Sequence, residues 1–140
     1  MSGGFESVAT ARSRGGGLPR ARLAMVRHSP AQIAPVARAQ RRRFLRHAGL
    51  RAADLDGLGL ALLDNWSRAQ AKVELLDRYF AAAGFLDASG EPRPAAKVYF
   101  ADLNSARLAA DRLAEHLKAR GVGAPSMVAI LQGTARRVDP

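Results

Sequence analysis

Apolar residues recur along two stretches of the chain at spacings of three, four or seven, the period of one face of an α-helix. The first seam is Leu55, Leu62, Trp66, Ala69, Val73, Leu76, Phe80 and Ala83, and the second is Tyr99, Leu103, Ala106, Ala110, Leu113 and Leu117. Gly84 and Gly121 follow the two stretches and suit the left-handed position that ends a helix. The pattern predicts helices over residues 58–83 and 95–120.

The residues between the seams predict how the two helices are joined. Residues 87–94 read Asp-Ala-Ser-Gly-Glu-Pro-Arg-Pro, which is a run of turn-forming residues. Two matched seams joined by such a loop predict an antiparallel helical hairpin with coiled-coil-like packing. Asp54 or Asp56 is expected to cap the first helix. The predicted fold class is therefore all-α.

A shorter helix is predicted before the hairpin. Ser29 and Pro30 could begin it, but Pro35 would then lie inside the helix, where proline is unfavourable. The ordered helix is therefore expected over residues 35–48, ending at Gly49. The chain divides into a disordered basic arm (1–28), a segment holding the short basic helix (29–51), the hairpin core (52–121) and a C-terminal tail (122–140).

The apolar face of the hairpin is wider than one helix pairing can bury, because Val98, Phe100 and Leu108 extend the second seam. We therefore expect copies of the chain to pack on one another. The alternative is that the N-terminal helix and the C-terminal tail cover this surface within one monomer. The residues expected at the oligomer interface are Leu62, Trp66, Val73, Leu76, Phe80, Tyr99, Leu103, Leu113 and Leu117.

Positive charge is confined to one end of the chain. The sequence holds 22 basic and 12 acidic residues, for a net charge of +10. Residues 1–51 contain eleven arginines and a single acid, Glu6, so they carry the whole excess. A one-sided basic segment is typical of nucleic-acid binding. A solubilising tail and an organellar transit peptide are the alternatives.

Four arginines of the predicted 35–48 helix recur at spacings that place them on one face. We call Arg38, Arg41, Arg42 and Arg46 the arginine stripe. Aromatic residues do not alternate with the arginines, Phe44 excepted, which favours contacts to duplex phosphates over the stacking of single-strand bases. The residues expected to bind double-stranded DNA are Arg38, Arg41, Arg42, Arg43, Arg46 and Arg51.

Motifs for other chemistry are missing from the sequence. There is no cysteine, no metal-ligand spacing among the histidines, no nucleophile motif and no nucleotide-binding glycine motif. His116 follows Glu115 and is interpreted as half of a solvated pair. We therefore expect no enzyme activity, cofactor, metal or small-molecule substrate. No apolar run approaches a membrane span, and the expected location is the cytoplasm.

The C-terminal tail holds a short apolar patch at Met127–Leu131, followed by two arginines. Short apolar segments often become ordered on a partner, although folding back on the hairpin is an equal alternative. The residues expected to bind a protein partner are Met127, Ile130, Leu131, Arg136 and Arg137.

Several features between Leu58 and Val122 occur together in a known family. They are Trp66 near the middle of the first helix, a glycine and two hydrophobes at its end (84–86), the Gly-Glu-Pro-Arg-Pro loop (90–94), and a leucine-rich second helix ending at Gly121. This stretch resembles the small subunit of phage terminase, of the type with a helical-hairpin core. After the last glycine that family carries Thr-Pro and a basic residue, which residues 121–126 match only in part.

The resemblance implies an activity and its partners. Small terminase subunits form rings, bind the packaging-start region of viral DNA and deliver it to the large subunit, which carries the ATPase and the nuclease. The chain would then be a phage or prophage protein in the host cytoplasm, without an active site of its own. Two other hypotheses stay open: a dimeric helical DNA-binding or regulatory protein, and a helical scaffold or adaptor for protein partners.

Overall fold

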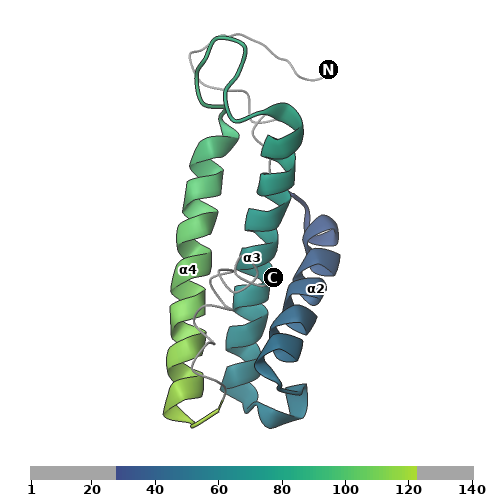
Figure 1. The fold of residues 1–140 in the computed structure, drawn as a ribbon, viewed down its shortest axis with the longest axis vertical. Helices are drawn as coiled ribbons and strands as arrows, with labels where there is room; N and C mark the ends of the chain where they lie inside the picture. Colours follow the sequence, from purple (N-terminus) through teal and green to yellow (C-terminus); the bar gives the residue numbers. More distant parts are fainter. Residues whose placement is uncertain (1–27, 123–140) are drawn as a thin grey trace, which may run out of the picture.

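The computed structural model describes residues 28–122, and these residues form three α-helices. Helix α2 spans Pro30–Ala48, α3 spans Gly57–Ala83 and α4 spans Ala95–Ala119, with a short 3-10 helix, η1, at Ala52–Asp54. Figure 1 shows α3 in the middle, with α4 antiparallel on one side and α2 on the other. The predicted all-α fold with an antiparallel hairpin is confirmed, and both hairpin helices lie within one residue of their predicted bounds.

Helix α2 begins five residues earlier than predicted, and the reason is its N-terminal cap. Ser29 Oγ accepts a hydrogen bond from the Gln32 backbone N–H at 3.2 Å, and Gln32 Oε1 accepts one from the Ser29 N–H at 2.8 Å. This reciprocal capping box satisfies two N–H groups that a helix start leaves open. Pro30 occupies the first helical position, where proline is favourable. Pro35 therefore lies inside the helix, and the prediction of a start at residue 35 was wrong.

The main core lies where all three helices meet. Phe44 of α2 is fully buried, and its ring centroid is 5.8 Å from that of Trp66 on α3, with a 59° angle between the ring planes. Tilted aromatic pairs of this kind stabilise beyond the area that they bury. Leu113 and Leu117 of α4 complete this cluster, together with Leu63. Trp66 is therefore a core residue.

Two smaller clusters lie further along α3. Ile33 and Ala37 of α2 pack with Ala71. Near the loop of the hairpin, Leu76 packs with Ala95 of α4. Most of the buried residues in these two clusters are alanines, which bring the helices close but remove little apolar surface from water.

Burial corrects the predicted oligomer interface. Trp66 is 3% exposed, and Val73, Leu76, Leu113 and Leu117 are no more exposed than this. These five side chains are already buried within one chain, so their assignment to an interface between copies was wrong. Helix α2 packs on α3. Coverage of the hairpin by the N-terminal helix of the same chain was one half of the monomeric alternative. Of the remaining interface residues, Leu62, Phe80 and Tyr99 are half-buried, and Leu103 is exposed.

The loop of the hairpin is held by two side chains. Asp87 Oδ1 accepts hydrogen bonds from the Ser89 hydroxyl at 2.6 Å and from the backbone N–H groups of Ser89 and Glu91. These bonds, chiefly the one from the Ser89 hydroxyl, lower the pKa of Asp87. The Arg93 guanidinium donates to the carbonyls of Gly84 and Ala83 at the end of α3, at 2.8 and 2.7 Å. These hydrogen bonds from two side chains therefore fix the conformation of the loop.

At the opposite end of the hairpin, Gly59 permits a close approach between its own backbone and the carboxylate of Asp56. A Cβ at Gly59 would lie 2.9 Å from Asp56 Oδ1 and 3.7 Å from His116 Cδ2. Asp56 caps α3 by accepting a hydrogen bond from the Gly59 N–H at 2.7 Å. The cap and the glycine therefore occupy the same small space.

We expect Gly59→Ala to destabilise the protein by about 1–3 kcal/mol, the usual cost of overpacking. Alanine is normally the better helix residue, so the sign is the informative result. Gly57→Ala is the matched control, since nothing lies within 4 Å of its Cβ position, and it should leave the free energy of unfolding unchanged or raised. Urea denaturation measures both, and equal effects of the two substitutions would contradict the close approach.

Candidate nucleic-acid interface

The outer face of α2 carries a dense group of arginines. Arg38, Arg42 and Arg46 are exposed, and Arg41 is half-buried. The buried positions of α2 are Ile33, Ala37, Gln40 and Phe44. Because these recur every three or four residues, they form the side of α2 that packs on α3, so Arg38, Arg42 and Arg46 lie on the other side and Arg41 lies at its edge. Three of the four stripe arginines therefore share the exposed face of α2.

A buried polar contact fixes the rotation of α2 against α3. Gln40 is only 4% exposed, and its Nε2 donates to Glu74 Oε1 on α3. Gln40 Oε1 accepts a hydrogen bond from Arg43 Nη1 at 3.2 Å. The other oxygen of Glu74 accepts from Arg78. Buried polar groups of this kind favour one arrangement, because any slip would leave them unpaired.

The remaining two predicted DNA-binding residues lie beside the stripe. Arg43 is half-buried on the flank of α2 and is partly occupied by Gln40. Arg51 is exposed in the segment after α2, where its backbone N–H donates to Asp54 Oδ2 at 2.8 Å. The sequence analysis missed Gln40 and its contact with Glu74. The signal that could have found Gln40 is a polar residue in register with Ile33, Ala37 and Phe44.

The charge of α2 is not neutralised locally. Helix α2 contains five arginines and no acid. Asp64, Glu74 and Asp56 form ion pairs whose partners lie on α3 and α4 or at the C-terminal end of α4. Asp64 and Glu74 pair with Arg68 and Arg78 one turn further along α3. Arg38, Arg42 and Arg46 are therefore exposed with no acid on their own helix.

The stripe has the length of a short run of phosphates. From Arg38 to Arg46 the helix rises about 12 Å at about 1.5 Å per residue. One strand of duplex DNA presents a phosphate about every 3.4 Å along its axis. The stripe therefore spans about three or four phosphates. Guanidinium groups bind phosphate oxygens in a bidentate manner.

Helices α2 and α3 do not form a helix-turn-helix motif. In that motif two helices cross at roughly 90–120° and are joined by a turn of about 3–4 residues. Here residues 49–56 join the helices, and α2 lies alongside α3 (Figure 1). The exposed face of α2 is therefore suited to contact a DNA backbone.

Contacts of Asp56 with His116 and Arg120 join the start of α3 to the end of α4. Asp56 Oδ1 accepts from His116 Nε2 at 2.9 Å, and Arg120 Nε lies 3.4 Å from Asp56 Oδ2. The hydrogen bond from His116 is the main cause that lowers the pKa of Asp56, with the Gly59 N–H second. The interpretation of His116 as a solvated partner of Glu115 was wrong. Its partner is sixty residues earlier in the chain.

The Asp56 cluster predicts acid-sensitive stability. The pKa of Asp56 lies below 3.8 in the folded state, so its ionised form stabilises the fold above that pH. This contribution is lost as the pH falls through the folded-state pKa. We expect Asp56→Asn to lower the free energy of unfolding near neutral pH and to change it little in strong acid. Asp111→Asn, at an exposed site of α4, is the control. A destabilisation by Asp56→Asn that is equal at both pH values would contradict the ionic role.

Within 28–122, no three His, Asp or Glu side chains come together as metal ligands. No helix of this part is long and apolar enough to span a membrane. The predicted partner-binding residues Met127, Ile130, Leu131, Arg136 and Arg137 lie outside the described residues, as does the arm over residues 1–27.

The comparisons with known proteins add no relative: no family model matches the chain, and neither a curated protein nor a solved structure matches it significantly.

Proposed function

We propose that the chain binds double-stranded DNA through the arginine stripe of α2 and acts as the small subunit of a phage terminase. The observation that carries the DNA-binding proposal is a helix with five arginines and no acid, whose exposed face has no carboxylate partner within residues 28–122. A duplex phosphate backbone is the natural counter-charge for such a face.

In this mechanism the arginines bind the phosphates of the duplex and do not recognise its bases. Each phosphate that an arginine neutralises releases condensed counterions, which favours binding at low salt. Four stripe arginines give a slope of log K against log salt of about −3.6 per engaged subunit. Contacts to phosphate carry no sequence information. A preference for one DNA site must therefore come from an arginine that reaches a guanine edge, or from DNA bending.

The terminase role rests on the resemblance over residues 58–122. In that role the hairpin is the platform that presents α2, and several copies on one duplex convert weak contacts into avidity. Cleavage and ATP hydrolysis belong to the large subunit, so the small subunit needs no catalytic group. The apolar patch and the arginines of the C-terminal tail are the proposed contact to the large subunit.

We expect the quadruple change of Arg38, Arg41, Arg42 and Arg46 to Ala to abolish most duplex DNA binding and to flatten the salt dependence. Alanine favours the helix, so α2 should persist. The matched control removes four other positive charges by Ala substitution, at Arg68, Arg107, Arg112 and Lys118, all exposed on α3 and α4. Fluorescence anisotropy with labelled duplex at several salt concentrations measures affinity and slope.

Equal losses in the two quadruple variants would mean that net charge alone drives binding, and an unchanged affinity in the stripe variant would refute the proposed interface. The circular dichroism spectrum of each variant confirms that the helices are retained. A dimeric regulatory protein would give the same stripe result, so the terminase role needs its own test.

That test is co-purification with a large terminase subunit encoded beside this chain. Deleting residues 125–140 should abolish the co-purification and leave duplex binding intact, because the stripe lies on α2. Retained co-purification would place the contact elsewhere on the chain. If the wild-type chain binds duplex DNA but no large subunit, the regulatory alternative is favoured.

A further inference from the structure

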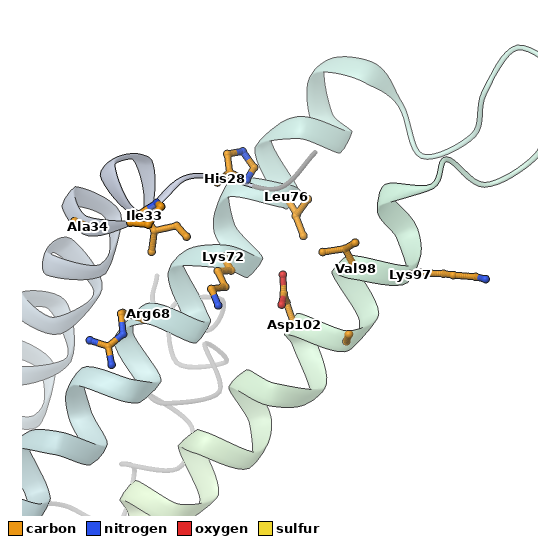
Figure 2. Close-up of a pocket in the computed structure, with 11 residues that line it drawn as sticks. His28, Ile33, Ala34, Arg68, Lys72, Leu76, Lys97, Val98 and Asp102 are labelled. Atoms are coloured by element: carbon orange, nitrogen blue, oxygen red, sulfur yellow. The ribbon is translucent and has the colours of Figure 1, made fainter. Parts of the chain in front are cut away.

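A groove with an apolar floor opens between α2 and α4, across α3. It has a volume of ≈ 770 Å³, within the range of about 300–1,000 Å³ that is typical of binding pockets. Figure 2 shows Ile33, Leu76 and Val98 turned into this space from the three helices. The exposed alanines Ala34 and Ala101 also line it. The groove therefore lies between the two small clusters of the core, whose buried residues are mostly alanines.

The charged side chains around the groove do not favour an occupant of either charge. Lys72 and Asp102, which are of opposite charge, point into the same gap between α3 and α4 (Figure 2). Arg68 is paired with Asp64, and Lys97 extends outward, away from the groove. The apolar floor is thus the feature that selects an occupant, and it suits a short segment of apolar side chains.

The described part of the chain begins at the groove itself. His28 lines the groove, and it is held beside α2 because the next residue, Ser29, caps that helix. Residues 23–26, Leu-Ala-Met-Val, end two positions before His28 and are the longest unbroken apolar stretch before residue 50. We call them the apolar run. At about 3.6 Å per residue, its two ends lie within about 7 and 18 Å of His28.

The length of the apolar run also matches the groove. Along α3 the groove extends from Arg68 to Leu76, a rise of about 12 Å at about 1.5 Å per residue. Four extended residues span about 13 Å. The run therefore reaches the groove from its point of attachment and can lie along the whole floor.

The apolar patch of the C-terminal tail starts much further from the groove. Val122 packs on the main core at the other end of α4, and the groove residue Val98 lies about 32 Å along α4 from Ala119. Met127 is at most about 18 Å from Val122, and Leu131 comes as far as about 32 Å only on a fully extended chain. The short connection of the apolar run gives it the higher effective concentration at the groove.

We propose that the apolar run packs into the groove of its own chain, with its leucine, methionine and valine side chains on the floor formed by Ile33, Leu76 and Val98. These three side chains then complete a part of the core that alanines fill poorly. Arg22 and Arg27 stay at the two ends of the run, where their long side chains reach solvent. The disorder expected for the basic arm is then confined to the residues before 23. The contact does not use the arginine stripe and is independent of DNA binding by α2.

A pair of introduced cysteines tests the contact directly, because the chain has no cysteine of its own. Met25→Cys with Ala101→Cys should form a disulfide within one chain under mild oxidation, since Ala101 is exposed and lines the groove. Met25→Cys with Ala82→Cys is the matched control, at an exposed alanine of α3 outside the groove. The control should cross-link at least about tenfold more slowly, because a disulfide needs Cα atoms about 4.4–6.8 Å apart. Non-reducing electrophoresis separates cross-links within a chain from those between two chains.

Trypsin gives an independent measurement with a control inside the same chain. The bonds after Arg22 and Arg27 flank the apolar run, whereas those after Arg12 and Arg14 lie well before it. In the wild-type chain we expect the two flanking bonds to be cut at least about tenfold more slowly, because cleavage follows the population of the undocked state. Mass spectrometry of the fragments over time gives the rate at each bond.

Ala101→Glu places a charge at an exposed position of the groove and should abolish the difference between the two pairs of bonds. Ala82→Glu is the matched control and should preserve it. Glutamate is a good helix former, so both variants should keep their helices, which thermal unfolding followed by circular dichroism checks.

Four results would overturn the proposal. They are equal cleavage at all four bonds of the wild-type chain, protection that survives Ala101→Glu, loss of protection in Ala82→Glu as well, and equal cross-linking of the two cysteine pairs. Cross-links that form mainly between two chains would assign the groove to a second copy instead. A faster cross-link from Ile130→Cys with Ala101→Cys would assign it to the C-terminal tail.

Discussion

The contact between Phe44 and Trp66 is the interaction on which the arrangement of this chain depends. Trp66 sits on the central helix, and the cluster around it takes side chains from all three helices. Phe44 brings α2 onto α3 at this point, and Leu113 and Leu117 bring α4 there. Since both outer helices pack on α3, the orientation of α2 is set by how Phe44 fits, with the Gln40–Glu74 contact one turn away.

The position of the arginines follows from that orientation. A helix that buries residues 33, 37, 40 and 44 exposes the opposite face along its whole length. Arg38, Arg42 and Arg46 of the stripe occupy that face, and Arg41 lies at its edge. Two acids of α3, Asp64 and Glu74, are engaged by arginines of α3 itself or by Gln40. The packing therefore presents the positive charge of α2 and leaves it unbalanced.

The sequence predicted the hairpin well because its information is local. The seams, the turn residues at 87–94 and the glycines at 84 and 121 lie within a few residues of the elements that they define. The start of α2 was missed because a capping box at Ser29 and Gln32 outweighs an internal proline. Gln40–Glu74 and Asp56–His116 were missed because their partners are 34 and 60 residues apart. The seam residues were assigned to an interface because apolar periodicity indicates burial but does not identify the covering element.

Repulsion among the arginines of the stripe also destabilises α2 in the free protein. Like charges three or four residues apart destabilise a helix by about 0.2–0.5 kcal/mol per pair, and no acid on α2 offsets them. The packing of Phe44 and the buried Gln40 must outweigh this repulsion for α2 to stay on α3. An anion bound along the stripe removes the repulsion and adds its own binding free energy to the folded state. Docking of α2 and binding of a polyanion are therefore coupled: the helix surface that costs stability in the free protein is the one that gains most when a phosphate backbone occupies it.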